Sequence, residues 1–176
     1  PAGDPARRSG PFPGDDPDPE KSGLFLCLCT NKHSLALDAA NAKDRQHILE
    51  LAASSDLVVE SYPPGHSKQL GLHYDAIRQR NNQTVLTSIT HFGQTGPYKD
   101  WEGEEIVDYA LGGYMYFGGS ADREPLMVPN NQPQLNAGAQ AAIASLGAIW
   151  WARQSGQGQH VDISAMQTVT VTQIHA

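Results

Sequence analysis

The sequence predicts an α/β fold in which helices pack on a parallel sheet. Apolar runs at residues 34–38, 57–60 and 85–90 have strand length, and helical patterning marks residues 42–54 and 74–80 between them. Strand, helix, strand, helix, strand is the order expected of a parallel sheet with right-handed crossovers, so a doubly wound arrangement is predicted. The 176 residues can bury one ordinary core, which favours a single domain or part of one.

The beginning of the chain is predicted to be irregular. Residues 1–23 are rich in proline, glycine and aspartate without helical or strand periodicity, so we expect an extended loop there. Leu24–Cys29 is an apolar run too short for a helix, and its state is left open, whereas Ser34–Asp38 is expected to be a strand. In a strand, Cys27 and Cys29 would share a face. Because no second Cys or His pair completes a zinc pattern, we interpret them as reduced, packed thiols.

The next segment supplies a helix and a strand in succession. Asn41 is expected to cap a helix from Ala42 to Ser54, because its side chain can accept hydrogen bonds from the first free N–H groups. The apolar side chains on one face of this helix are Ile48, Leu49, Leu51 and Ala52. A strand at 57–60 follows and ends at the turn 63–65, and a short helix at 74–80 leads into the strand 85–90.

The second half contains the longest apolar element. Residues 104–117 keep helical spacing. Leu135–Arg153 is apolar on nearly every side, so this helix is expected to be buried deeply or to lie in an oligomer interface. His160–Ile163 is predicted to be a buried strand, after which Ser164 can cap a further helix.

Composition and missing motifs exclude several classes of function. The net charge of −7 is spread over single acidic residues, which argues against nucleic acid as the partner. No apolar run is long enough to span a membrane and no basic-then-apolar signal begins the sequence, so a cytoplasmic protein without a membrane partner is expected. The seven histidines are scattered, and no metal site is expected. Serine-hydrolase and P-loop motifs are not found.

Two places remain as candidates for ligand binding. The loop His91–Tyr98 follows the strand 85–90, where open α/β sheets bind ligands, and its glycines could expose N–H donors. It could equally be a tight connector in which glycine only satisfies the backbone. Arg7 and Arg8 near Asp4 could hold a phosphate or a carboxylate, or could be solvated loop charges.

The order of several motifs resembles CoA-transferase family III, the CaiB/BaiF or formyl-CoA transferase-like proteins. These motifs are Gly3–Arg7, Asn31–Asp38, Asp56–Glu60, Phe92–Tyr98 and Gly156–Ser164. The resemblance implies a Rossmann-like large domain within a longer protein that also has a small domain and forms an interlocked homodimer. It implies that 1–23 follows a missing N-terminal strand, and that 24–176 is a partial large domain truncated at its C-terminus.

The resemblance also implies a chemistry and a set of site residues. Family members use an aspartate as nucleophile on a CoA thioester and pass CoA to a carboxylic acid, with no covalently bound cofactor. In this chain the position of that aspartate falls on Gln134, so the catalytic residue is unknown. Residues at positions that bind CoA in the family are Arg7, Leu37, Ser61 and Tyr62.

Two functions therefore remain open. The first is transfer of CoA between an acyl-CoA and a carboxylic acid. The second is a catalytically silent CoA-transferase-like domain with a binding or scaffolding role. Gln134 in place of the aspartate favours the second, and the resemblance implies that Ala40 and Gln69 replace two cations that bind CoA in the family, which weakens the grip on its diphosphate.

Overall fold

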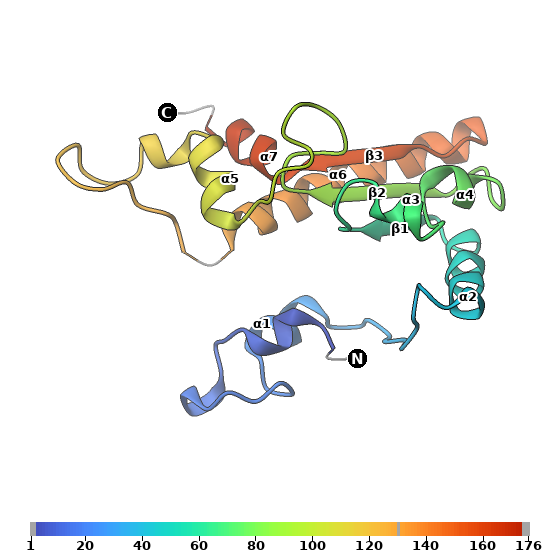
Figure 1. Ribbon diagram of the computed structural model, residues 1–176, viewed down its shortest axis with the longest axis horizontal. Helices are drawn as coiled ribbons and strands as arrows, with labels where there is room; N and C mark the ends of the chain where they lie inside the picture. Colours follow the sequence, from blue (N-terminus) through green and yellow to red (C-terminus); the bar gives the residue numbers. More distant parts are fainter. Residues whose placement is uncertain (1–2, 130, 174–176) are drawn as a thin grey trace. The chain divides into compact units, whose positions relative to one another are not determined.

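The computed structural model describes residues 3–129 and 131–173. The chain divides into two compact units, Pro1–Asp38 and Ala39–Ala176. Each is described by itself, and Figure 1 gives the labels of the helices and strands.

The first unit consists of short helical turns joined by loops. Two 3-10 helices, η1 (Pro5–Arg8) and η2 (Pro13–Asp15), lie within the predicted loop, and α1 (Gly23–Leu28) follows. The buried hydroxyl of Ser22 starts α1 by accepting a hydrogen bond from the Phe25 amide at 3.1 Å.

The structure assigns the segment 24–29, whose state the sequence leaves open, and contradicts two predictions for this unit, the packing of Cys27 and the strand at 34–38. Leu24–Cys29 contributes to a helix despite its length, because Ser22 caps it, and Cys27 is consequently exposed. Both cysteines are free thiols. Ser34–Asp38 has no regular secondary structure, and Leu35 is 66% exposed. A strand requires a neighbour to receive its hydrogen bonds, and the sheet of the described residues pairs only segments of the second unit.

The second unit is built on a parallel sheet, as predicted. Strands β1 (Leu57–Glu60), β2 (Val85–Thr90) and β3 (His160–Ser164) lie in the order β1-β2-β3. Leu57 is in register with Val85, and Leu86 with His160. The three carboxyl ends therefore meet at one edge of the sheet.

Helices cover both faces of this sheet, which confirms the α/β fold (Figure 1). Neighbouring residues of β2 point to opposite faces. Leu86 packs against Leu49 of α2 (Ala42–Ala53) and Ile77 of α4 (Tyr74–Arg78). Val85 packs against Ala148 of α6 (Gln132–Ser155) on the other side. Asn41 caps α2 as predicted, accepting from the amides of Lys43 and Asp44.

The long helix α6 contacts the sheet through small residues. Its buried positions include Ala137, Ala141, Ser145, Ala148 and Ala152. The Ser145 hydroxyl lies 2.7 Å from that of Thr87 on β2. The larger apolar side chains of α6 instead lie on its outer side: Ile143, Leu146, Trp150 and Trp151 are each more than half exposed. The expectation of deep burial is wrong for these residues, and an interface stays a prediction.

The remaining helices follow the ends of strands and loops. α3 (His66–Gln69) comes after the turn that ends β1, and α5 (Glu105–Leu111) with η3 (Tyr114–Tyr116) comes after β2. α7 (Ala165–Val171) begins directly after β3, where the Ser164 hydroxyl accepts from the Gln167 amide as predicted.

Candidate functional site

Two cavities adjoin the segment that leaves β1, and both lie entirely within the second unit. At this edge the carboxyl ends of parallel strands leave room for a ligand between the loops that follow them. Ser61 and Tyr62 line both cavities.

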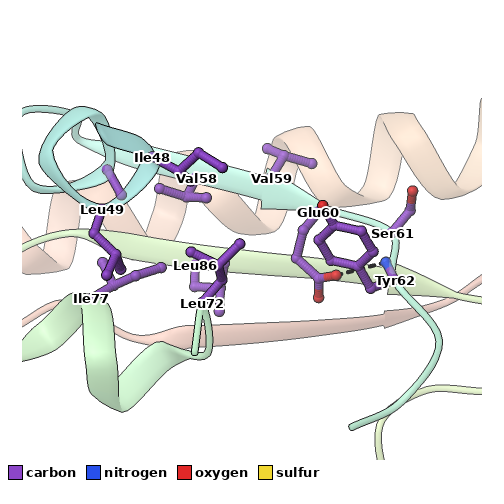
Figure 2. A pocket seen from close by; sticks show the side chains of 11 residues that line it. Ile48, Leu49, Val58, Val59, Glu60, Ser61, Tyr62, Leu72, Ile77 and Leu86 are labelled. Carbon is purple, nitrogen blue, oxygen red and sulfur yellow. Dashed lines mark hydrogen bonds between the residues drawn. The ribbon is translucent and has the colours of Figure 1, made fainter. Parts of the chain in front are cut away.

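The first cavity is apolar and has a volume of about 370 Å³. Figure 2 shows aliphatic side chains from α2, β1 and the region of α4 turned toward it. The polar Glu60 lies at the end near Tyr62, and its carboxylate accepts a hydrogen bond from the Tyr62 amide at 2.7 Å. The lining residues suit a flat ring or an alkyl chain, because they remove apolar surface from water.

The second cavity is larger, about 620 Å³, and we call it the polar cavity because charged side chains line it beside aromatic residues and prolines. It lies between the segments that follow β1 and β2 and the stretch leading into α5. Lys99, Asp100, Glu102 and Glu104 line it together with His91. The aromatic ring of Phe92 supports this wall, with ring centroids 6.4 Å from Tyr98 and 6.3 Å from Trp101.

Tyr62 is the aromatic residue common to both cavities. Its side chain is about one-third exposed, at 37% of its surface, and its ring centroid lies 5.3 Å from that of His66. A partly exposed ring beside an apolar cavity can stack on a nucleobase. Ser61 and Tyr62, sequence neighbours and two of the four residues predicted to bind CoA, both line the two cavities, and their role stays a prediction.

The loop His91–Tyr98 behaves mainly as a connector. Gly93 and Gly96 have φ of 87° and 93°, which other residues rarely adopt. The amide of Gly93 donates to the Thr90 hydroxyl, and that of Gln94 donates to the Asp162 carboxylate at 2.9 Å. These two donors hold the loop against β2 and β3, so they are not available to a ligand. Only the beginning of the loop, His91 and Phe92, lines the polar cavity.

Arg7 belongs to the first unit and is already engaged there. Its guanidinium lies 2.7 Å from the Glu20 carboxylate and 3.8 Å from the centre of the Phe25 ring. A phosphate at this guanidinium would have to share it with Glu20.

The other predicted residues lie apart from these cavities. Leu37 is half-buried in the first unit. Gln134 is exposed in the first turn of α6 and lines neither cavity. Because α6 packs antiparallel to the strands it connects, this first turn lies toward the carboxyl edge of the sheet.

Sequence analysis missed Asp108, which pairs with His91. Asp108 Oδ2 lies 2.7 Å from His91 Nδ1, and the carboxyl group is fully buried. Burial raises the pKa of Asp108, and the hydrogen bond to His91 partly offsets this effect. The available signal was that Asp108 is the one charged residue in the apolar run Ile106–Leu111.

Within 3–129 and 131–173, no group of three His, Cys, Asp or Glu side chains is arranged to hold a metal ion. No helix in this part of the chain is long and apolar enough to cross a membrane.

Comparison with known proteins identifies the family to which this chain belongs. The family model of CoA-transferase family III matches residues 1–175. The chain therefore belongs to CoA-transferase family III, which confirms the resemblance of its motifs.

Particular relatives cover nearly all of this chain. It is 35% identical over 167 residues to the succinyl-CoA:(R)-benzylsuccinate CoA-transferase subunit BbsE of Thauera aromatica, covering 95% of this chain and 41% of that protein. It is 32% identical over 165 residues to the probable CoA-transferase Rv1866 of Mycobacterium tuberculosis, covering 92% of this chain and 21% of that protein.

A solved structure confirms the fold. The CAIB/BAIF family protein from Brucella suis matches with a TM-score of 0.89 at 28% identity, over 99% of this chain and 46% of that one. The chain spans less than half the length of each of these proteins.

Proposed function

We propose that this chain is part of a protein that binds a CoA thioester and moves CoA between an acyl-CoA and a carboxylic acid. The observation that carries the proposal is the wall formed by Ser61 and Tyr62 between an apolar and a polar cavity. The adenine ring of CoA can stack on an aromatic side chain such as Tyr62, and Lys99 of the second cavity could pair with a phosphate, although Asp100, Glu102 and Glu104 line the same cavity. Membership of the family supports the same substrate class.

The Gln134 amide limits what this chain can do by itself. A nucleophile that forms an acyl-enzyme anhydride must be an ionised carboxylate, whereas an amide carries no charge. The position is otherwise suited to a carboxylate, because it lies in the first turn of α6, where free N–H groups favour negative charge. No acidic residue occupies that turn.

Mass spectrometry of the full-length protein tests the proposal. After incubation with a panel of acyl-CoA thioesters, hydroxylamine would trap any anhydride as a hydroxamate. We expect no acylation at Gln134 in the wild type and acylation in a Gln134→Asp variant. A Gln134→Asn variant is the matched control and should stay unacylated. Failure of the aspartate variant to become acylated by any thioester would contradict a transferase site at this helix.

A second candidate is a catalytically silent domain that binds or scaffolds an active copy. Gln134 favours it, and so does the exposed apolar face of α6. Two relatives are consistent with divided roles: one is named as a subunit, and the other is covered to only 21%, half the share of the first. In this case the full-length protein binds CoA thioesters but transfers CoA only with an aspartate-bearing partner or repeat.

For the whole protein we further propose a homodimer and a cytoplasmic location. The large apolar residues on α6 would be covered in the dimer. Two free cysteines, one of them exposed, suit a reducing compartment.

A further inference from the structure

The polar cavity contains a carboxylate–imidazole pair. His91 lines the cavity, and 37% of its side chain is exposed, whereas Asp108 is fully buried behind it. His91 Nδ1 and Asp108 Oδ2 are 2.7 Å apart. The other ring nitrogen, Nε2, has no hydrogen-bond partner among the described residues and is not among their buried, unpaired atoms. It is therefore open to a ligand or to water.

The main chain and the ring of His91 are each held by neighbouring residues. The His91 carbonyl accepts hydrogen bonds from the Met166 amide and the Ser164 hydroxyl, both at 3.0 Å. Gly103 lies so close that a Cβ there would overlap the imidazole ring. The ring of a histidine held in this way is already in one position, so little side-chain entropy is lost when it reaches the reactive geometry.

An ionised carboxylate beside Nδ1 selects the proton position on the ring. In its ionised form Asp108 can only accept a hydrogen bond, and this form therefore favours the tautomer with the proton on Nδ1 and a lone pair on Nε2. Asp108 Oδ1 is buried without a partner among the described residues, so this carboxylate directs its hydrogen bonding to His91 alone. The other charged groups that line the cavity are Lys99, Asp100, Glu102 and Glu104.

We propose that the cavity carries a second activity, hydrolysis of a CoA thioester, in which His91 is the general base for a water molecule and Asp108 is its positioning residue. This inference rests on the proposed function for binding of the thioester. It goes beyond that function because water, not a carboxylic acid, takes the acyl group. It requires no nucleophile at Gln134.

The atoms balance in two steps. His91 Nε2 takes a proton from water while the water oxygen forms a bond to the thioester carbonyl carbon. When the tetrahedral intermediate collapses, the carbon–sulfur bond breaks and the CoA thiolate takes the proton from Nε2. The products are free CoA and the carboxylic acid. Asp108 keeps its hydrogen bond to Nδ1 throughout and stabilises the positive ring between the two steps.

Release of the CoA thiol from the full-length protein without any acceptor acid measures this activity. Acyl-CoA thioesters are added, and the free thiol is titrated with a chromogenic disulfide while binding is followed separately by calorimetry. We expect His91→Gln to lower the rate by about 100-fold or more, the usual contribution of a general base, with unchanged thioester affinity. His47→Gln, on the outer side of α2, is the matched control and should retain the wild-type rate.

The results distinguish failure of this inference from failure of the proposed function. Binding without thiol release in the wild type, or equal rates in wild type and His91→Gln, overturns the inference but leaves the proposed function standing. Absence of thioester binding overturns both. Asp108→Asn should lower the rate at least tenfold, because the imidazole loses the carboxylate that holds its proton on Nδ1.

Nitrogen NMR of histidine-labelled wild-type protein supplies a test without any variant. The chemical shifts of His91 should show a proton on Nδ1 and none on Nε2 near neutral pH. A proton on Nε2 would overturn the role of base, whatever the fate of the variants.

Discussion

Burial of the Asp108 carboxyl has a cost that depends on pH. The group is fully buried, and desolvation raises its pKa above the unfolded value despite the hydrogen bond to His91. Ionisation of Asp108 therefore destabilises the folded state relative to the unfolded state. The folded protein nevertheless places this carboxyl group beside the imidazole of His91. Such perturbed groups in a cavity mark candidate functional sites.

A pH series of unfolding experiments measures this cost. In the wild type, the stability associated with neutral Asp108 is fully present below the unfolded pKa and is lost as pH rises through the raised folded pKa. The free energy of unfolding of the wild type minus that of Asp108→Asn should therefore fall as pH rises. This difference in unfolding free energy should fall by about 1.4 kcal/mol for each unit by which the folded pKa of Asp108 exceeds its unfolded pKa.

An exposed aspartate provides a control of opposite sign. The pKa of Asp122 is lowered by its hydrogen bond from Ser120, so its contribution is present at neutral pH and is lost as pH falls through the folded pKa. Urea unfolding of Asp122→Asn and Asp108→Asn across acid and neutral pH should give opposite trends. If the free energy of unfolding of the wild type minus that of Asp108→Asn instead rises with pH, the fold stabilises the ionised form of Asp108 and the prediction is wrong.

At the scale of elements, two glycines lie in contrasting surroundings, one tightly packed and the other open. Gly103 faces the His91 ring, whereas nothing lies within 4 Å of a Cβ placed at Gly147 in the middle of α6. We expect Gly103→Ala to destabilise the fold by about 1–3 kcal/mol through overpacking. Gly147→Ala should stabilise it by about 0.5–1 kcal/mol, because alanine favours the helix. Denaturant unfolding of the two variants measures both values, and destabilisation by Gly147→Ala would indicate that a partner covers this face.

The elements of the sheet could be predicted from the sequence because their patterns are local. The strands β1, β2 and β3 and the caps of α2 and α7 were confirmed, but the predicted burial of β3 is wrong, since His160 and Asp162 are exposed. Residues 24–29 and 34–38 were not, because length and apolarity alone do not show whether a cap or a neighbouring strand is present.

The site was less predictable than the fold. Ser61 and Tyr62 were identified only through the family motifs, since neither residue type at that spacing indicates a ligand. Asp108 was missed because its partner lies 17 residues away along the chain, and the pair forms only when α5 folds back on the end of β2. Of the two alternatives predicted for α6, deep burial is wrong for its outer side and an interface stays a prediction, because apolar composition alone does not distinguish a core from an interface.

At the scale of the whole molecule, the exposed side of α6 predicts an assembly. Leu146→Glu combined with Trp150→Glu should convert the proposed dimer of the full-length protein to monomer, because two charges would be buried in the contact. Sedimentation velocity measures the mass of each form. Leu35→Glu, at a similarly exposed residue of the first unit, should leave it unchanged. An unchanged mass for the double variant would exclude α6 as the interface.

The central claim is that the wall between the two cavities binds CoA, and calorimetric titration of the full-length protein with CoA tests it most directly. We expect Tyr62→Ala to weaken binding by about 1–3 kcal/mol, the usual contribution of one base stacked on an aromatic ring. Tyr116→Ala, which removes an 87% exposed ring from η3 outside both cavities, should leave binding unchanged. Equal affinity in Tyr62→Ala and wild type, or no CoA binding by the wild type, would contradict the account.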